Sequence, residues 1–124
     1  SAYYEENEID INEIFLDGYI CKNSIYKITR KQNRKISAIL LAVNSPDGES
    51  DYIWCIAWNR NAKILKDIGV GSHLKCLGRI QERKVFCRKM KTIKFVRKNE
   101  EEPEIGEWQQ VYEVSIGKME LLEE

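Results

Sequence analysis

Three large aromatic side chains share one parity in the segment 51–60, which reads Asp-Tyr-Ile-Trp-Cys-Ile-Ala-Trp-Asn-Arg. If the segment is a β-strand, side chains alternate between two faces, so Tyr52, Trp54 and Trp58 lie on the same face. Compact residues such as Cys55 occupy the other face and suit the interior of a narrow barrel. The rings could form a platform on which flat rings stack. The alternative is that they cover a second core or a subunit interface.

The net charge is zero, but the twenty basic and twenty acidic residues are segregated along the chain. Residues 22–35 contain six bases and no acid, and residues 75–98 contain ten bases and the single acid Glu82. Such segregation can create a local positive field that attracts polyanions, even around a neutral molecule. The alternative is that the acidic and basic segments pair with each other in the fold.

Five strands and one helix are needed to position these residues. The apolar patterns predict strands over residues 11–21, 35–44, 51–60, 73–87 and 109–122. A further short strand over residues 25–29 leads into an exposed hairpin tip. Residues 59–68 change to helical spacing, with Asn59 or Asn61 able to cap the start and Gly69 able to end the helix. A helix between the third and fourth of five strands is the order of an all-β oligonucleotide/oligosaccharide-binding (OB) fold barrel.

The length of 124 residues and the hydrophobic content of 43% suit one domain with one core. We expect residues 1–10 to be a flexible N-terminal segment and residues 11–122 to form the folded domain. Residues 88–107 are predicted to be a long hairpin or loop. No apolar run is long enough for a signal peptide or a membrane span, so we expect a cytoplasmic protein with no membrane partner.

Residue types that could carry catalysis or bind metals are sparse. The four cysteines lack Cys-x-x-Cys spacing, so we expect reduced, partly buried thiols and no metal. His73 has no Cys or Ser partner at a recognisable spacing. The glycines of residues 69–72 lack the preceding strand and following helix of a phosphate-binding loop. We therefore predict that the protein is not an enzyme and has no cofactor.

Five stretches occur in an informative order, with sensible gaps between them. They are residues 12–18 (Asn-Glu-Ile-Phe-Leu-Asp-Gly), 40–44, 51–62, 78–83 and 112–120. In this order the sequence resembles the bacterial single-stranded DNA-binding proteins, especially the short clostridial type. The resemblance implies an OB-fold barrel that binds single-stranded DNA without strong sequence preference. It also implies a homo-oligomer, a tetramer or a dimer, associated with the bacterial nucleoid in replication, repair or recombination.

The resemblance also assigns positions on the predicted third strand. The family's base-stacking positions fall on Tyr52 and Trp58, and a position that is basic in the family is here Trp54. Two departures occur where relatives often carry glycine, namely at Asn59 and at the basic hairpin tip, residues 30–34.

On the predicted fourth strand, the family's basic positions fall on Gln81 and Arg83. Its aromatic position falls on Val85, with Phe86 adjacent. The acidic tail by which family members recruit other enzymes has no counterpart, because the sequence stops at residues 122–124. We therefore do not expect recruitment of replication enzymes through a tail.

We predict that single-stranded DNA lies across the second, third and fourth long strands, with bases on the rings and phosphates on the cations. The predicted stacking residues are Tyr52, Trp54, Trp58 and Phe86, and the predicted phosphate contacts are Arg34, Lys35, Arg60, Arg79, Arg83 and Lys84. Two alternatives stay open. One is a primosome-type protein-interaction module on the same fold, and the other is binding of single-stranded RNA.

Overall fold

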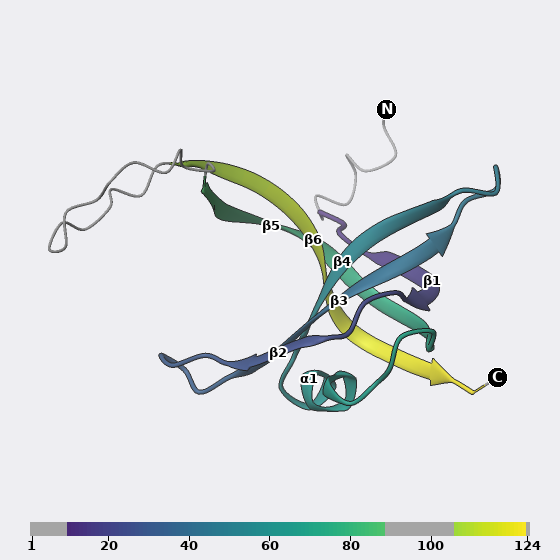
Figure 1. Cartoon of the computed structure of the whole chain (residues 1–124), viewed down its shortest axis with the longest axis horizontal. Helices are drawn as coiled ribbons and strands as arrows, with labels where there is room; N and C mark the ends of the chain where they lie inside the picture. The colour runs from purple at the N-terminus through teal and green to yellow at the C-terminus, as the bar shows by residue number, and fades with distance from the viewer. Residues whose placement is uncertain (1–9, 89–105, 124) are drawn as a thin grey trace, which may run out of the picture. The chain divides into compact units, whose positions relative to one another are not determined.

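The computed structural model describes residues 10–88 and 106–123 of the chain (Figure 1). Nearly all of the predicted N-terminal segment and most of the predicted 88–107 hairpin or loop lie outside the described residues. The elements are β1 (Ile14–Ile20), β2 (Ile25–Ile28), β3 (Lys35–Asn44), β4 (Ser50–Trp58), α1 (Asn59–Lys66), β5 (His73–Arg88) and β6 (Gly106–Leu122). The fold is all-β with one helix after the aromatic strand, as the sequence predicts. The short segment near residue 25 is a separate strand.

The strands form one sheet in the order β1-β5-β6-β4-β3-β2. A further pairing joins β1 to β3 through Tyr19 opposite Ala42 and Ile20 opposite Leu41, which closes the sheet into a ring. β4 and β6 run parallel, whereas β1 pairs antiparallel with β3 and β5. This closed arrangement is an OB-fold barrel.

The chain divides into two compact units. The first unit, residues 1–81 and 113–124, contains the closed barrel and α1. The second unit is residues 82–112, of which the structure describes the far end of β5 and the beginning of β6. Each unit is described separately below.

Small and branched side chains fill the barrel, as the alternation in β4 predicts. Its core consists of Leu16, Ile20, Ile39, Leu41, Cys55, Ala57, Leu65, Leu74, Cys76, Val114 and Ile116. The thiols of Cys55 and Cys76 hydrogen-bond each other in this core, and that bond together with burial raises the pKa of Cys55. All four cysteines are free thiols, of which Cys55 and Cys76 are buried and Cys21 and Cys87 are half-buried.

Two glycines allow strands to approach closely in the barrel wall. A Cβ at Gly18 would lie 2.4 Å from the carbonyl oxygen of Ala42, and one at Gly78 would lie 2.2 Å from that of Ser115. Both distances are far shorter than a non-bonded contact allows, so no larger residue fits without moving the backbone. Glycine at positions 18 and 78 therefore lets β3 and β6 approach β1 and β5 closely.

Helix α1 is held against the barrel by hydrogen bonds as well as by its buried Leu65. The hydroxyl of Ser37, buried on β3, donates to the carbonyl oxygen of Ala62 over 2.7 Å, and the amide of Asn61 donates to that of Gly117 over 3.3 Å. The predicted cap was wrong. Trp58 occupies the N-cap position without a side-chain hydrogen bond, and Asp67 rather than a glycine ends the helix. No helix in the described part of the chain is long and apolar enough to cross a membrane.

Candidate nucleic-acid interface

The outer face of β4 presents the aromatic side chains that the sequence singles out. Tyr52 is 64% exposed and Trp54 is 39% exposed, whereas Cys55 is completely buried. Ile56 shares the outer face but is buried. The strand therefore places two rings in solvent and anchors its other face in the core.

Neighbouring β3 supplies a low apolar floor beside these rings. The antiparallel register sets Ala42 opposite Tyr52 and Leu40 opposite Trp54. Residues directly opposite each other point to the same side of a sheet, so these side chains share the outer face. Because alanine is short, the Tyr52 ring has a small neighbour across the strand pair and stays accessible.

Trp58 differs from the other two rings because a cation covers it. The guanidinium carbon of Arg34 lies 4.3 Å from the centroid of the Trp58 ring, a cation–π distance. Backbone contacts hold Arg34 in place: its N–H donates to the Thr29 hydroxyl over 3.1 Å, and its carbonyl accepts from the Thr29 N–H over 2.8 Å. Asn33 makes the turn in the left-handed region, with φ of +52°. The two predicted residues are therefore in contact, and the Arg34 guanidinium covers the Trp58 ring.

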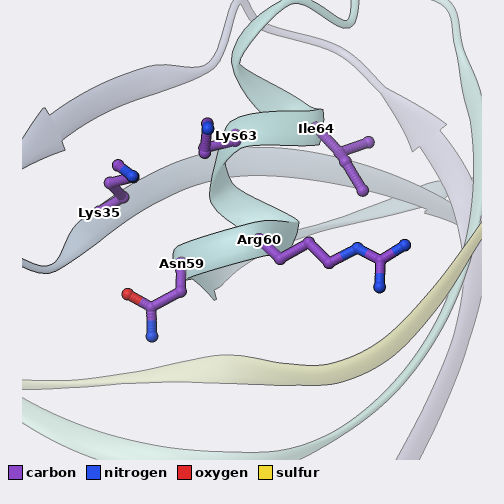
Figure 2. A pocket seen from close by; sticks show the side chains of 5 residues that line it. All are labelled: Lys35, Asn59, Arg60, Lys63 and Ile64. Carbon is purple, nitrogen blue, oxygen red and sulfur yellow. The ribbon is translucent and has the colours of Figure 1, made fainter.

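A cationic pocket lies where β3 meets the first turns of α1 (Figure 2). It has a volume of about 460 Å³ and is lined by Lys35, Asn59, Arg60, Lys63 and Ile64. Three of the five lining residues are cations and none is acidic, so the pocket suits an anion such as a phosphate. The predicted Lys35 and Arg60 meet here. Lys63 was not predicted, although its position one turn beyond Arg60 on the helix gave the signal.

Asn59 stands at a position where the family that the sequence resembles often has glycine. Its φ of +53° lies in the left-handed region, where glycine is free and asparagine is the best-tolerated alternative. Figure 2 shows the Asn59 and Arg60 side chains leaving the first turn of the helix in different directions. The sharp turn therefore lets strand β4 pass directly into α1 while Arg60 joins the pocket.

The predicted residues of β5 do not all join the aromatic face of β4. Arg79 is exposed, but β6 lies between β5 and β4 in the strand order. Gln81 donates from its amide to the carboxylate of the buried Glu113 over 2.9 Å, so it serves the barrel wall. Arg83 and Phe86 belong to the second unit.

The second unit carries an aromatic contact that the sequence reasoning missed. Trp108 is 69% exposed, and its ring meets that of Phe86 with 5.4 Å between centroids and 59° between planes. A surface pocket beside it, about 530 Å³ in volume, is lined by Lys84, Trp108, Gln109 and Gln110. The acidic stretch before Trp108 suggested a loop, but β6 begins at Gly106 and includes it. The period-two pattern of Trp108, Gln110 and Tyr112 was the available signal.

Two further clusters of polar side chains bear on the chemistry of the described surface. The side chains of His73 on β5 and Asp17 on β1 contact each other, and this contact involves none of Lys35, Arg60 and Lys63. Residues 10–88 and 106–123 contain no group of three or more His, Cys, Asp or Glu side chains placed to hold a metal ion. The exposed rings of β4 suit stacking, and the cationic pocket suits anion attraction.

Fold and surface together place the chain among OB-fold barrels with an exposed aromatic strand and adjoining cations. No family model matches the chain, and no curated protein matches it in sequence. Among solved structures, it is similar to the single-stranded DNA binding protein from Thermus aquaticus, with 16% identity, a TM-score of 0.66 and 92% of this chain covered. The match spans 41% of the Thermus protein's length.

A second solved structure is matched over nearly its whole length. The dimeric N-terminal domain of PriB protein from Thermoanaerobacter tencongensis has 16% identity and a TM-score of 0.61. The match covers 91% of this chain and 98% of that domain. Both likenesses show that the chain shares its fold with these proteins.

Proposed function

We propose that the protein binds single-stranded DNA without strong sequence preference, by stacking bases on Tyr52, Trp54 and Trp58. The observation that carries the proposal is the exposure of Tyr52 and Trp54 on the outer face of β4, with the short Ala42 opposite Tyr52. Unpaired bases present flat faces that stack on such rings, whereas duplex bases are already stacked. The sequence motifs and the fold shared with a single-stranded DNA binding protein support the same conclusion.

Phosphates are held by the cations around the barrel and on the hairpin. Lys35, Arg60 and Lys63 of the cationic pocket attract the backbone electrostatically, and each neutralised phosphate contributes a log–log salt slope of about −0.7. Stacking contributes about 1–3 kcal/mol per base by alanine substitution and is less sensitive to salt. Arg79, on β5 of the barrel unit, is a further proposed phosphate contact. Arg83, Lys84 and Phe86 belong to the second unit and are proposed contacts there. Stacking therefore sets most of the preference for unpaired strands.

Arg34 has two uses in this scheme. In the free protein its guanidinium covers the Trp58 ring. When a base stacks on Trp58, the guanidinium moves to a phosphate, where a charge-assisted hydrogen bond replaces the cation–π contact. The exchange keeps the indole covered until DNA arrives.

A titration of oligothymidine against tryptophan fluorescence tests the proposal. We expect quenching by the single strand at low salt and much weaker quenching by a duplex of the same length. An absence of quenching, or equal quenching by the two, contradicts the proposal. Oligouridine in the same assay separates DNA from RNA binding, because stacking alone does not distinguish the sugars.

We also propose that the protein forms a dimer or a tetramer. In this form it would act in replication, repair or recombination in the bacterial cytoplasm. Phe15 on β1 lies directly opposite Leu77 on β5, and these two side chains are 62% and 38% exposed. Such a pair of exposed apolar side chains favours a protein contact. Native mass measurement should give an oligomer for the natural chain and a smaller species for Phe15→Glu. The primosome-type alternative instead predicts that Trp54→Ala and Trp58→Ala break the oligomer and leave DNA binding intact.

The proposal includes no catalytic step and no cofactor. Binding through stacking and phosphate contacts needs neither a nucleophile nor a metal ion, and the Cys55 and Cys76 thiols are buried in the barrel core. The protein acts in this scheme by holding and covering the strand.

A further inference from the structure

The β3–β4 face carries opposite charge at its two ends. At one end lies the basic hairpin tip, residues 30–34, which contains three cations and no acid. At the other end lies the turn that joins β3 to β4, residues 45–51, which contains three acids and no cation and is called the acidic turn below. Figure 1 shows these two segments at opposite ends of the β3–β4 pair. The exposed charged residues are Arg30 and Lys31 on the tip and Asp47, Glu49 and Asp51 on the acidic turn.

The acidic turn opposes the ligand of the proposed function, because carboxylates repel phosphates. Asp51 directly precedes Tyr52, the last ring at this end of β4. A single strand of DNA that passes over the rings from Trp58 towards Tyr52 therefore meets negative charge where it leaves the face. Cations brought from outside the molecule would cancel this repulsion.

Both charged segments are preformed turns. In the acidic turn, the Glu49 N–H donates to the Asp47 carboxylate over 3.0 Å, and the Ser45 N–H donates to the Glu49 carbonyl oxygen over 2.7 Å. In the basic hairpin tip, the Thr29 N–H donates to the Arg34 carbonyl oxygen over 2.8 Å. A contact between two preformed turns loses little conformational entropy, so weak charge pairs can stabilise it.

We propose that the basic hairpin tip of one copy contacts the acidic turn of the next copy, so that copies line up head to tail along one single strand of DNA. A contact between two different surfaces of the same chain repeats in one direction, which suits a linear ligand. The inference rests on the proposed single-strand binding, because the strand aligns the copies. It is separate from the self-association through Phe15 and Leu77, which lie on β1 and β5.

The two charged segments meet between copies because they cannot meet within one copy. β3 separates them and has ten residues, which is about 33 Å at about 3.3 Å per residue. An ion pair requires its nitrogen and oxygen atoms to lie within about 4 Å. A second copy supplies both the acids that the tip lacks and the cations that the turn lacks. The competing occupant of the tip is a different acidic protein, which would not involve the acidic turn.

Charge reversal at the two ends tests this contact. Three variants are compared with the natural chain: Arg30→Glu with Lys31→Glu, Asp47→Lys with Glu49→Lys, and all four substitutions together. The measured quantity is the cooperativity factor, which is the affinity per site on a long labelled oligothymidine divided by the affinity for a short one with room for one bound protein. The natural chain should give a factor of about 2- to 30-fold, as expected for two exposed ion pairs. Each double variant should lose this factor, and the fourfold variant should regain it.

The cooperativity factor separates the contact between copies from the affinity for DNA. If Arg30 and Lys31 also meet phosphates, their reversal weakens binding to both oligothymidines and cancels in the ratio. A factor that is unchanged in either double variant, or that does not return in the fourfold variant, overturns the inference. A natural chain that binds the short oligothymidine with a factor of one overturns the inference alone. A natural chain that does not bind the short oligothymidine contradicts the proposed function as well.

A cross-linking measurement on the natural chain does not depend on the folding of these variants. Isotope-labelled and unlabelled protein are mixed on long oligothymidine and treated with a carbodiimide, which joins an ammonium group to a nearby carboxylate through an amide bond. We expect peptides that join Lys31 of one copy to Asp47 or Glu49 of a differently labelled copy. Lys31→Arg is the matched control, because it keeps the charge and the cooperativity factor but cannot form the amide. Absence of these mixed peptides from the natural chain overturns the inference.

Discussion

The β3–β4 face and the β5–β6 hairpin both present aromatic rings, but they are built differently. The rings of β4 stand on a sheet whose other side is the barrel core, with Cys55 and Ala57 completely buried below them. The described residues of the hairpin, 82–87 and 106–112, include no buried side chain. The barrel face is therefore rigid and needs little ordering on binding, whereas the described residues of the hairpin form no core that would fix its rings.

The coverage of the rings also differs between the two regions. On the barrel, exposure falls from Tyr52 to Trp54, and Trp58 is half-buried under the Arg34 guanidinium. On the hairpin, Trp108 is the most exposed tryptophan and touches only another ring edge among its described aromatic contacts. On the rigid barrel face, a cation can cover an aromatic ring. On the hairpin, where no described side chain is buried, the ring of Trp108 stays exposed.

The largest expected contrast concerns thiol reactivity in the two regions. Cys55 and Cys76 are buried in the barrel, and their mutual hydrogen bond and burial raise the pKa of Cys55 and disfavour its thiolate. Cys87 on the hairpin is half-buried. We expect a thiol reagent to label Cys87 at least about a thousandfold faster than Cys55, because Cys55 reacts only after global unfolding. Mass spectrometry of labelled peptides gives the two rates, and comparable rates would show that the barrel opens as easily as the hairpin.

The next largest contrast concerns the free energy of unfolding after substitution of two equally crowded glycines, one in each region. A Cβ at Gly78 would lie 2.2 Å from the Ser115 carbonyl oxygen, and one at Gly106 would lie 2.3 Å from that of Cys87. Gly78→Ala should lower the free energy of unfolding by about 1–3 kcal/mol, since the barrel wall must move. Gly106→Ala should leave it nearly unchanged, because none of the hairpin residues that the structure describes is buried. Chemical denaturation measures both, and an equal loss in the two variants would contradict the separation of the units.

The smallest expected effect concerns the cation over Trp58. Arg34→Ala and Arg30→Ala remove the same charge from one hairpin tip, and each should reduce the log–log salt slope of DNA binding by about 0.7 if its cation meets a phosphate. Only Arg34→Ala removes the cation–π contact, which contributes about 0.5–1 kcal/mol at an exposed site. We therefore expect Arg34→Ala to shift the emission of free Trp58 and, at high salt, to bind DNA more tightly than Arg30→Ala. Identical emission and affinity in the two variants would remove Arg34 from this role.

Strand positions could be predicted because periodicity is a local property of the sequence. β3 was predicted at residues 35–44 and lies there, since its branched apolar run has no turn residue inside it. The placement of small Cys55 inside the barrel followed from alternation in β4. The glycine at position 18 could be recognised as a point of close approach because the surrounding strand would otherwise favour a larger residue.

Contacts between distant segments could not be predicted in the same way. The stacking of Arg34 on Trp58 depends on the register of β3 with β4 and on the turn at Asn33, neither of which has a local pattern. Trp108 was overlooked because the glutamates before it suggested a loop, whereas pairing with β5 extends β6 to Gly106. The helix cap failed for a similar reason, because Trp58 must continue β4 while it occupies the N-cap position.

The central claim is that unpaired bases stack on the rings of the β3–β4 face. The variant with Trp58→Phe and Trp108→Phe leaves Trp54 as the only tryptophan. Trp54 is 39% exposed and lies opposite Leu40. We expect oligothymidine to quench Trp54 emission at low salt. The quenching should persist when the salt concentration is high enough to release nonspecific phosphate contacts. A duplex should leave Trp54 emission nearly unchanged. Constant Trp54 emission while a labelled single strand binds would contradict the account.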